Sequence, residues 1–242
     1  MGRPLRPVAD GLVYHAINRG NNRDRVFADD GDFRAFLRAL AQTQLRYPFA
    51  LFGYALMSNH FHLVLRPEPG QSISRILQSL TVAHTWRYHR RHHSVGHVWQ
   101  GRFKSPVIQD DDHLLTVLRY VEANPLRAGM VGDLKEYPWT SYAAHGLGRA
   151  DPLLREAPVW SGLGATETAR QARWRRRVHE LLTERELAAL RRSVTSGRPY
   201  RSDAWAAGMG QLLGLATTPK RRGRPPKRQP APNEQAKTEK KI

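Results

Sequence analysis

The sequence predicts an α+β fold of the ferredoxin-like, split βαβ kind, in which an antiparallel sheet carries helices on one face. Strand-like runs of β-branched and aromatic residues alternate with segments whose apolar residues recur at helical spacing. Their order is β-α-β-β-α-β-α, and turn residues or prolines separate them. In such a fold the opposite face of the sheet is left free to hold a ligand.

The first half of the pattern holds three expected strands and one helix. Residues 12–18 (LVYHAIN) form the first strand, and a basic RGNNRDR turn follows. Residues 30–46 have apolar side chains at helical spacing, aspartates near their start and a proline soon after their end. Residues 49–57 and 61–65 are strand-like, and the Ser-Asn pair between them indicates a tight hairpin.

The second half adds two helices and a fourth strand. Residues 73–91 have helical periodicity and lead into a basic, histidine-rich loop. Residues 103–109 are a plausible strand. Three aspartates then begin a helix that extends to about Asn124, and Pro125 should stop it.

The remainder of the chain has a different composition. Residues 143–164 are rich in Gly, Ala and Pro and indicate a connector, whereas residues 166–194 predict one or two basic helices and residues 200–215 a further short one. The last segment has too few large apolar residues to fold alone. We therefore expect a catalytic domain, a basic helical extension and a disordered basic tail, at residues 1–145, 146–218 and 219–242.

The charge of the chain indicates a polyanionic partner. Of its 242 residues, 39 are Lys or Arg and 21 are Asp or Glu, which gives a formal net charge of +18. The tail contributes 9 − 2 = +7 of this excess, so +11 remains on residues 1–218. Nucleic acid is the leading partner and an acidic membrane surface the second. No apolar stretch is long enough to cross a bilayer and no signal peptide is apparent, which fits a soluble cytosolic protein without a membrane partner.

The absence of cysteine limits the chemistry of any metal site to His, carboxylate or amide ligands. His60 and His62 flank Phe61 in an expected strand. Alternate side chains of a strand face the same side, so the two imidazoles should project together and Phe61 should point into the core. Two neutral imidazoles can share one divalent ion. An arbitrary His-x-His pair is more often simply hydrogen-bonded or exposed.

Four segments in order resemble one family. YALMSNHFHLVL, the earlier YHAINRGNN and the later GHVWQGRFKS and LRYVEANPLRAGMV are similar to motifs of the REP-associated tyrosine transposases, relatives of the small insertion-sequence transposases that move single-stranded DNA. The resemblance covers about residues 12–142. It extends more loosely into the C-terminal segment SGRPYRSDAWAAGMGQLLG and the basic tail.

The resemblance implies a nuclease of the HUH class, named for two histidines around a hydrophobic residue. His60 and His62 would be metal ligands, and Tyr120 would be the nucleophile because it matches the family's tyrosine on the helix after the fourth strand. Asn124 would be the third metal ligand, although an Asn before a proline is also a common helix-ending residue. Mg²⁺ or Mn²⁺ would suit these ligands, and the imidazole pair would also accept Zn²⁺.

Helical periodicity is consistent with this position for the nucleophile. Leu114, Leu118 and Val121 form an apolar stripe that should face the core, and Tyr120 lies off that stripe. Glu122 is the competing carboxylate for a metal, but its position points it away from Tyr120. Without the resemblance, a tyrosine packed at the edge of a helix would be an equally good interpretation.

Basic and polar residues near the expected strand ends are candidates for DNA contact. They follow the first strand, flank the fourth, or follow the tyrosine helix: Arg19, Asn22, Arg23, Gln100, Arg102, Lys104 and Arg127. Trp99 and Phe103 either stack on bases or belong to the core. In the tail, Arg222, Gly223 and Arg224 resemble the core of an AT-hook, which enters a narrow minor groove. A solvated basic tail is the alternative.

The sequence therefore predicts a metal-dependent, single-strand DNA endonuclease and strand-transferase. The family implies that its substrates are hairpins of repetitive extragenic palindromes, cleaved through a 5′-phosphotyrosine intermediate. A non-catalytic DNA-binding regulator is the main alternative, and an RNA-binding module is a weaker one because it would not need the metal pair and the tyrosine together. The long C-terminal extension favours a monomer over a dimer with exchanged tyrosine helices.

Overall fold

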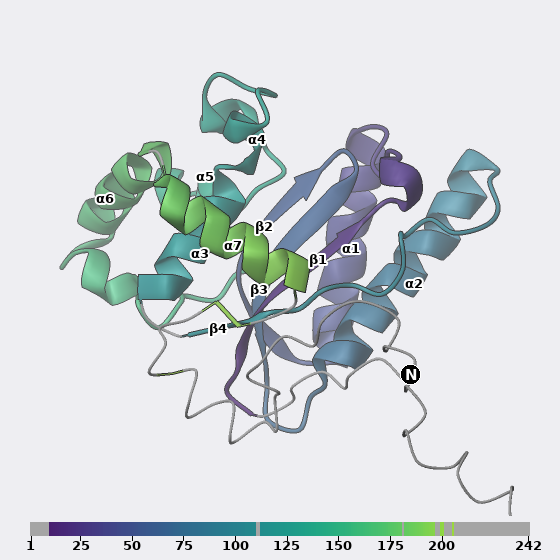
Figure 1. The fold of residues 1–242 in the computed structure, drawn as a ribbon, viewed down its shortest axis with the longest axis horizontal. Coiled ribbons are helices and arrows are strands. Elements are labelled where there is room, and N and C mark those ends of the chain that lie inside the picture. Colours follow the sequence, from purple (N-terminus) through teal and green to yellow (C-terminus); the bar gives the residue numbers. More distant parts are fainter. Residues whose placement is uncertain (1–9, 110–111, 181, 197–198, 201–204, 206–242) are drawn as a thin grey trace, which may run out of the picture.

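The computed structural model describes residues 10–109, 112–180, 182–196, 199–200 and 205. Its centre is a four-stranded antiparallel sheet with the order β2-β3-β1-β4 (Figure 1). The strands are β1 (Val13–Arg19), β2 (Phe49–Met57), β3 (His60–Pro67) and β4 (Val107–Ile108). This topology confirms the predicted ferredoxin-like class. The fourth strand is shorter than predicted, because only two of its residues pair with β1 as a continuous ladder.

Two long helices cover one face of the sheet. They are α1 (Asp30–Arg46) and α2 (Ile73–His92), and Figure 1 shows them side by side. The Asp29 carboxylate caps α1 by accepting from two backbone N–H groups, and Ser72 caps α2 in the same way with one. Their apolar sides pack with Tyr14, Phe61 and Leu63 of the strands into one core.

The other face of the sheet is also covered. The helix with Tyr120, α3 (Asp112–Glu122), packs there with Val13, Phe52 and Val64 in a second core. Gly53 of β2 allows this close approach, because an added Cβ would lie 2.6 Å from a Leu118 methyl carbon. The face that we predicted to be free for a ligand is therefore filled over much of its area. The reason is that β2 is buried along its whole length and offers apolar side chains to both faces.

The tyrosine helix ends earlier than predicted. Its regular part stops at Glu122, and a new short helix, α4 (Asn124–Arg127), begins after Ala123. Pro125 lies in the first turn of α4, where its missing N–H is tolerated, and so it does not act as the stop that we predicted. A break in the helix thus separates Tyr120 from Asn124.

The C-terminal part packs onto α3. After α4 the elements are η2 (Leu134–Glu136), α5 (Tyr142–Leu147), η3 (Trp160–Leu163), α6 (Glu167–His179) and α7 (Glu184–Ser196). The segment predicted as a connector contributes buried Ala157, Trp160 and Leu163 to the second core, beside Trp174 of α6. The two predicted basic helices are confirmed as α6 and α7. None of the described helices is both long and apolar enough to span a membrane.

Glu122 holds this extension against α3. Its buried carboxylate accepts from the Trp174 indole N–H at 2.7 Å and pairs with the His145 imidazole at 2.6 Å. The Ser141 hydroxyl also donates to it. The predicted orientation of Glu122, away from Tyr120, is explained by these contacts. The domain boundary predicted at residue 145 remains a prediction, because residues on both sides of it share one core.

Candidate active site

His60 and His62 lie at the hairpin end of β3 and face the side of the sheet that α3 covers. Phe61, between them, is fully buried in the opposite core, as strand alternation predicts. The centroids of the two imidazole rings are 5.0 Å apart. His62 is buried and His60 is partly exposed.

Each of these histidines has a hydrogen-bond partner at Nδ1. His60 Nδ1 lies 2.6 Å from Asn59 Oδ1, so the ring donates there and its Nε2 keeps a lone pair. His62 Nδ1 lies 2.9 Å from His15 Nε2, on the neighbouring strand β1. When His62 is the donor of this bond, its Nε2 also keeps a lone pair. Both ligand nitrogens that a divalent ion would need are then free.

Burial keeps this group of histidines neutral. Desolvation lowers the pKa of His60 to about 4 and that of His15 to about 3. The pKa of His62 is also lowered well below its usual value, first by desolvation and then by the neighbouring histidines. A neutral imidazole is the form that binds a metal ion, so no proton has to be displaced at neutral pH.

Tyr120 stands beside the histidine pair. Its ring centroid is 5.9 Å from that of His62 and 6.0 Å from that of His15, with both pairs edge to face. The guanidinium carbon of Arg127 lies 4.2 Å from the Tyr120 ring centroid, and Arg127 Nη2 donates to the Tyr120 carbonyl at 2.8 Å. The half-buried phenol therefore lies between two neutral imidazoles and one permanent cation.

Asn124 has a different environment from the one predicted for a metal ligand. Its Oδ1 accepts from Arg127 Nη2 at 3.0 Å, and its buried Nδ2 has no hydrogen-bond partner among the described residues. Across the described ranges, no group of three or more His, Cys, Asp or Glu side chains is arranged to hold a metal ion. The two histidines therefore fit a divalent ion, and a third ligand from Asn124 requires its amide oxygen to leave Arg127.

Several predicted DNA-contact residues lie together at the end of β1 near His60. Arg19 is paired in register with His60, and its guanidinium donates to Gln100 Oε1 at 2.8 and 3.0 Å. Asn22 and Arg23 follow in a turn with positive φ angles. Gly20 is required before them, because a Cβ there would lie 2.2 Å from the Asp24 carbonyl oxygen.

The other predicted contacts are more scattered. Lys104 forms an isolated bridge with Ile17, and exposed Arg102 precedes it in the chain. Arg127 belongs to the Tyr120 group instead. The AT-hook-like Arg222, Gly223 and Arg224 lie outside the described residues.

Two site features escaped the sequence analysis. His15 is buried against His62 because of the way β1 pairs with β3. The motif YHAINRGNN alone does not show which residues of β3 will lie beside His15. Asn59 was interpreted only as a turn residue, although its side chain bonds to His60. Of the two candidate stacking residues, Trp99 is core, since its ring is buried against Phe61 and His84. Phe103 is partly buried against the same core.

Comparison with known proteins shows which family this fold and its sequence resemble. Residues 8–124 match the family of IS200-like transposases. This part of the chain, just under half of it, is therefore similar to the IS200-like transposases.

The comparisons also confirm the more specific resemblance. A protein of Haemophilus influenzae assigned as a REP-associated tyrosine transposase is 27% identical over 154 residues, which cover 59% of this chain and 86% of that protein. A solved structure of a REP-associated tyrosine transposase bound to a REP hairpin matches with a TM-score of 0.52 and 17% identity, over 66% of this chain and 93% of the other. A protein of Deinococcus radiodurans assigned as a transposase matches with a TM-score of 0.36 and 18% identity, over 53% and 92% of the two chains.

Proposed function

We propose that this protein cleaves and rejoins single-stranded DNA at hairpins of repetitive extragenic palindromes, with Tyr120 as the nucleophile. The observation that carries the proposal is the position of the Tyr120 ring, about 6 Å from the rings of both His62 and His15 on the same face of the sheet. A tyrosine at a pair of neutral histidines suits phosphoryl transfer through a covalent intermediate.

His60 and His62 would hold a Mg²⁺ or Mn²⁺ ion through Nε2, and Asn124 is the proposed third ligand. Such an ion supplies Lewis-acid polarisation of a non-bridging phosphate oxygen. The Tyr120 oxygen attacks phosphorus in line and loses its proton, and the bond to the 3′-oxygen of the preceding nucleotide breaks. That oxygen takes up a proton and leaves as a free 3′-hydroxyl. The product is a 5′-phosphotyrosine, and attack by another 3′-hydroxyl reverses the step and transfers the strand.

Arg127 and the residues near Arg19 support DNA as the substrate. Arg127 carries a permanent positive charge beside the attacking phenol, where it can offset the charge of the scissile phosphate. A polar and basic edge lies next to His60 and is formed by Arg19, Asn22, Arg23 and Gln100. The relative bound to a REP hairpin makes a hairpin the first substrate to test.

The test uses end-labelled single-stranded hairpins from the genome that encodes the protein, incubated with Mg²⁺, Mn²⁺ or EDTA. We expect a covalent protein–DNA adduct with a metal ion and none with EDTA. Peptide mass spectrometry should place the nucleotide on Tyr120. An adduct on a different tyrosine, or one that forms equally well in EDTA, would overturn the assignment.

A non-catalytic DNA-binding regulator is the second candidate. The contact of Asn124 Oδ1 with Arg127 favours it, because this contact occupies the oxygen proposed to complete the metal site. The same experiment decides between the two. Tight hairpin binding without an adduct in any metal would support the regulator.

A further inference from the structure

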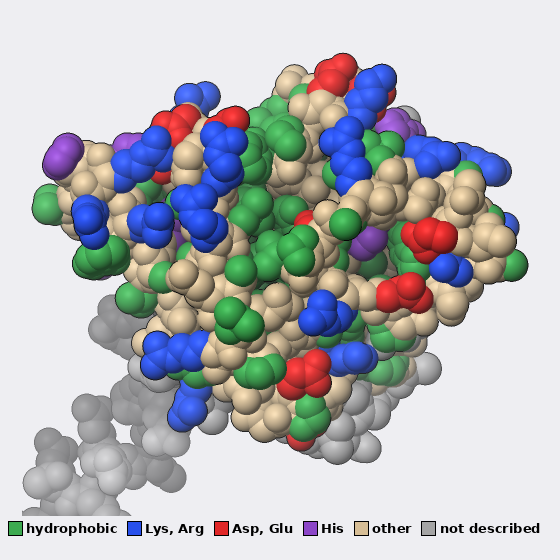
Figure 2. Space-filling model, turned by 180° about the vertical axis from the view of Figure 1, so that it is seen from behind, with side chains coloured by type: hydrophobic (Ala, Val, Ile, Leu, Met, Phe, Trp, Pro, Cys, Tyr) green, Lys and Arg blue, Asp and Glu red, His purple; other side chains and the backbone are tan. Residues whose placement is uncertain are grey.

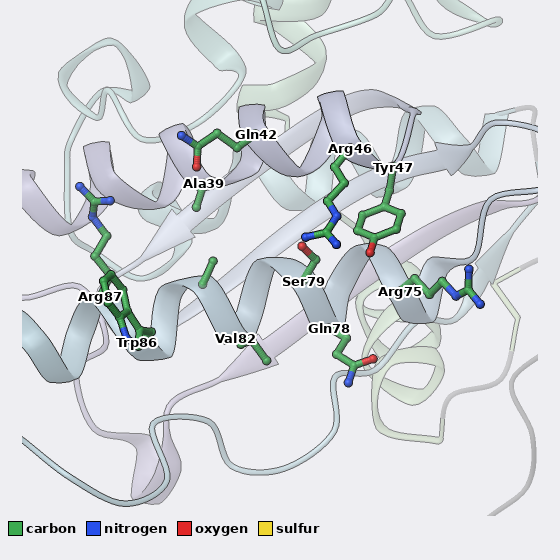
Figure 3. A pocket seen from close by; sticks show the side chains of 11 residues that line it. Ala39, Gln42, Arg46, Tyr47, Arg75, Gln78, Ser79, Val82, Trp86 and Arg87 are labelled. Atoms are coloured by element: carbon green, nitrogen blue, oxygen red, sulfur yellow. The ribbon is translucent and has the colours of Figure 1, made fainter.

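A groove of about 840 Å³ lies between α1 and α2 (Figure 3). These two helices pack on the opposite side of the sheet from Tyr120. Trp86 and Arg87 lie at one end of it and Arg75 at the other, while Arg46 extends from α1 toward α2. The stretch of α2 from Arg75 to Arg87 is about 18 Å long at roughly 1.5 Å per residue. Such a length matches about five stacked nucleotides at roughly 3.4 Å each.

The groove is basic because the surrounding sequence has almost no carboxylates. None of its lining residues is acidic, and Glu68 is the only Asp or Glu between Phe33 and Gln109. Arg91, further along α2, is neutralised by Asp29 and Asp32, whereas Arg75 and Arg87 have no carboxylate partner among the described residues. Figure 2 shows several Lys and Arg side chains at the upper left of that view, the side of the molecule on which α1 and α2 lie.

Trp86 is an aromatic ring left in solvent within this basic surface. It is 63% exposed, and Val82, one turn earlier, is 59% exposed. The Arg90 guanidinium lies 5.2 Å from the Trp86 ring centroid, so a cation and an aromatic plane stand together. Exposed aromatic rings interleaved with arginines are typical of surfaces that bind single strands, since bases stack on the rings and phosphates pair with the cations.

We propose that this groove binds a segment of single-stranded DNA, with a base stacked on Trp86 and phosphates on Arg46, Arg75 and Arg87. The inference rests on the proposed function for the identity of the polymer, but it assigns a second contact surface away from Tyr120. A second copy of the chain is a poor occupant, because two such faces would bring arginines against arginines. The groove would hold a flanking part of the strand that the catalytic face processes.

The test measures binding of a fluorescent oligothymidylate strand by anisotropy in EDTA, where metal-dependent cleavage is absent. Trp86→Ala should weaken binding by about 5- to 150-fold, and Trp86→Phe should retain most of the affinity because it keeps a stacking ring. Arg87→Ala should reduce the slope of log affinity against log salt by about 0.7. Arg176→Ala, which removes an exposed arginine of α6 outside the groove, is the matched control and should leave affinity nearly unchanged.

Photocrosslinking of a strand with 5-iodouracil gives a second measurement, and we expect the crosslinked peptide to contain Trp86. If the wild type binds the strand and neither Trp86→Ala nor Arg87→Ala weakens that binding, the groove is not the binding surface. The proposed function would still stand. No binding of single strands by the wild type would overturn both.

A different observation concerns His15, which lies behind His62 and contacts it through a hydrogen bond. It is only 2% exposed, its ring plane is within 25° of that of His62 at a centroid distance of 5.0 Å, and its Nε2 is 2.9 Å from His62 Nδ1. When the proton of His15 is on Nδ1, its Nε2 has a lone pair that can accept at this distance. Histidine ligands of metals commonly donate their second N–H to such an acceptor.

We infer that His15 is a positioning residue that accepts a hydrogen bond from His62 Nδ1 and so directs His62 Nε2 toward the metal position. This inference also rests on the proposed function. The bond selects one tautomer of His62, and because it lies near the planes of both rings it also limits rotation of the His62 imidazole. The hydrogen bond matters most at a buried site, because no water molecule is there to accept from His62 Nδ1 if His15 is removed.

The test measures Mn²⁺ affinity by electron paramagnetic resonance and the His62 tautomer by ¹⁵N NMR of the metal-free protein. His15→Phe should weaken Mn²⁺ binding by about 10- to 100-fold, and His15→Gln should recover part of the loss through its amide oxygen. His84→Phe, which replaces a buried histidine of the other core, is the control and should keep wild-type affinity.

The NMR readout separates failure of this inference from failure of the metal site. We expect His62 to carry its proton on Nδ1 in the wild type and a mixture of tautomers in His15→Phe. A wild-type His62 with its proton on Nε2 would overturn the positioning role even if no metal binds. Equal Mn²⁺ affinity of the wild type and His15→Phe would overturn it as well.

Discussion

The two sides of the sheet differ in how their polar side chains meet solvent. The face under α3 holds His15, His62 and Glu122, which are buried and hydrogen-bonded, with the half-buried Tyr120 at its edge. The groove between α1 and α2 holds exposed arginines and an exposed tryptophan. One face therefore removes its functional groups from water, and the other displays them.

Under the proposed function, this difference assigns cleavage to one face and strand binding to the other. Burial makes imidazoles neutral and fixes their geometry, which suits bond cleavage at one phosphate. Exposed guanidinium groups keep their charge and adapt to many strand conformations, which suits affinity without sequence preference. Changes on the α3 face should therefore act on chemistry or stability, and changes on the α1–α2 face should act on binding.

The largest expected effect is on the α3 face. Tyr120→Phe removes the nucleophilic oxygen and should reduce the rate of adduct formation by on the order of 10⁴-fold or more, while hairpin affinity changes little. Rates are measured from adduct bands on denaturing gels. Tyr54→Phe is the control, because it removes only a hydrogen bond to Asp151 and should leave the adduct intact. Adduct formation by Tyr120→Phe at the wild-type rate would contradict the assignment.

Removal of the Glu122 carboxylate should have the next largest effect, on stability. Glu122→Leu leaves the Trp174, His145 and Ser141 groups without their buried acceptor, and the free energy of unfolding should fall by about 3–5 kcal/mol. Urea denaturation measures the change. A loss below about 1 kcal/mol would show that the extension is held to α3 by its apolar contacts alone.

Lower pH should destabilise the folded protein through its buried histidines. Burial lowers the pKa of His60 to about 4 and that of His15 to about 3, so the unfolded chain binds protons at higher pH than the folded chain does. The stabilisation is present above about pH 6.5 and is lost as pH falls toward 4. Each such histidine should cost about 2 kcal/mol between pH 7 and pH 5.

Denaturant titrations across this pH window measure the loss. His15→Phe removes one titrating group, so its stability should fall less steeply with decreasing pH than that of the wild type. Parallel profiles for the two proteins would mean that His15 is not held neutral by burial.

The smallest expected effect is on the surface of α1. Arg34 pairs with Asp30 at 3.6 Å, and both side chains are more than half exposed. Arg34→Ala should change the free energy of unfolding by less than about 1 kcal/mol, because water screens the exposed ion pair and the guanidinium lies 5.8 Å from the Trp139 ring centroid, a weak contact at an exposed site. A loss above about 1 kcal/mol, measured by urea denaturation, would mean that charges on this side also support the fold.

Local sequence predicted the elements well because their signals are short-range. The start of α1 follows from its aspartates, and the end of β2 follows from the Ser-Asn turn. Strand alternation placed His60 and His62 on one face and Phe61 on the other. The break after Tyr120 was missed because a proline stops a helix or begins one depending on the turn before it.

The sequence by itself determined the order of elements, the α+β class, the basic character and the family motifs that contain His60, His62 and Tyr120. These depend on composition and on periodicity within a few residues. Tertiary structure alone decided that His15 meets His62, that Glu122 accepts from Trp174, and that α1 and α2 leave a basic groove between them. Each of these contacts joins side chains through strand register or helix packing, which depend on the whole core rather than on local spacing.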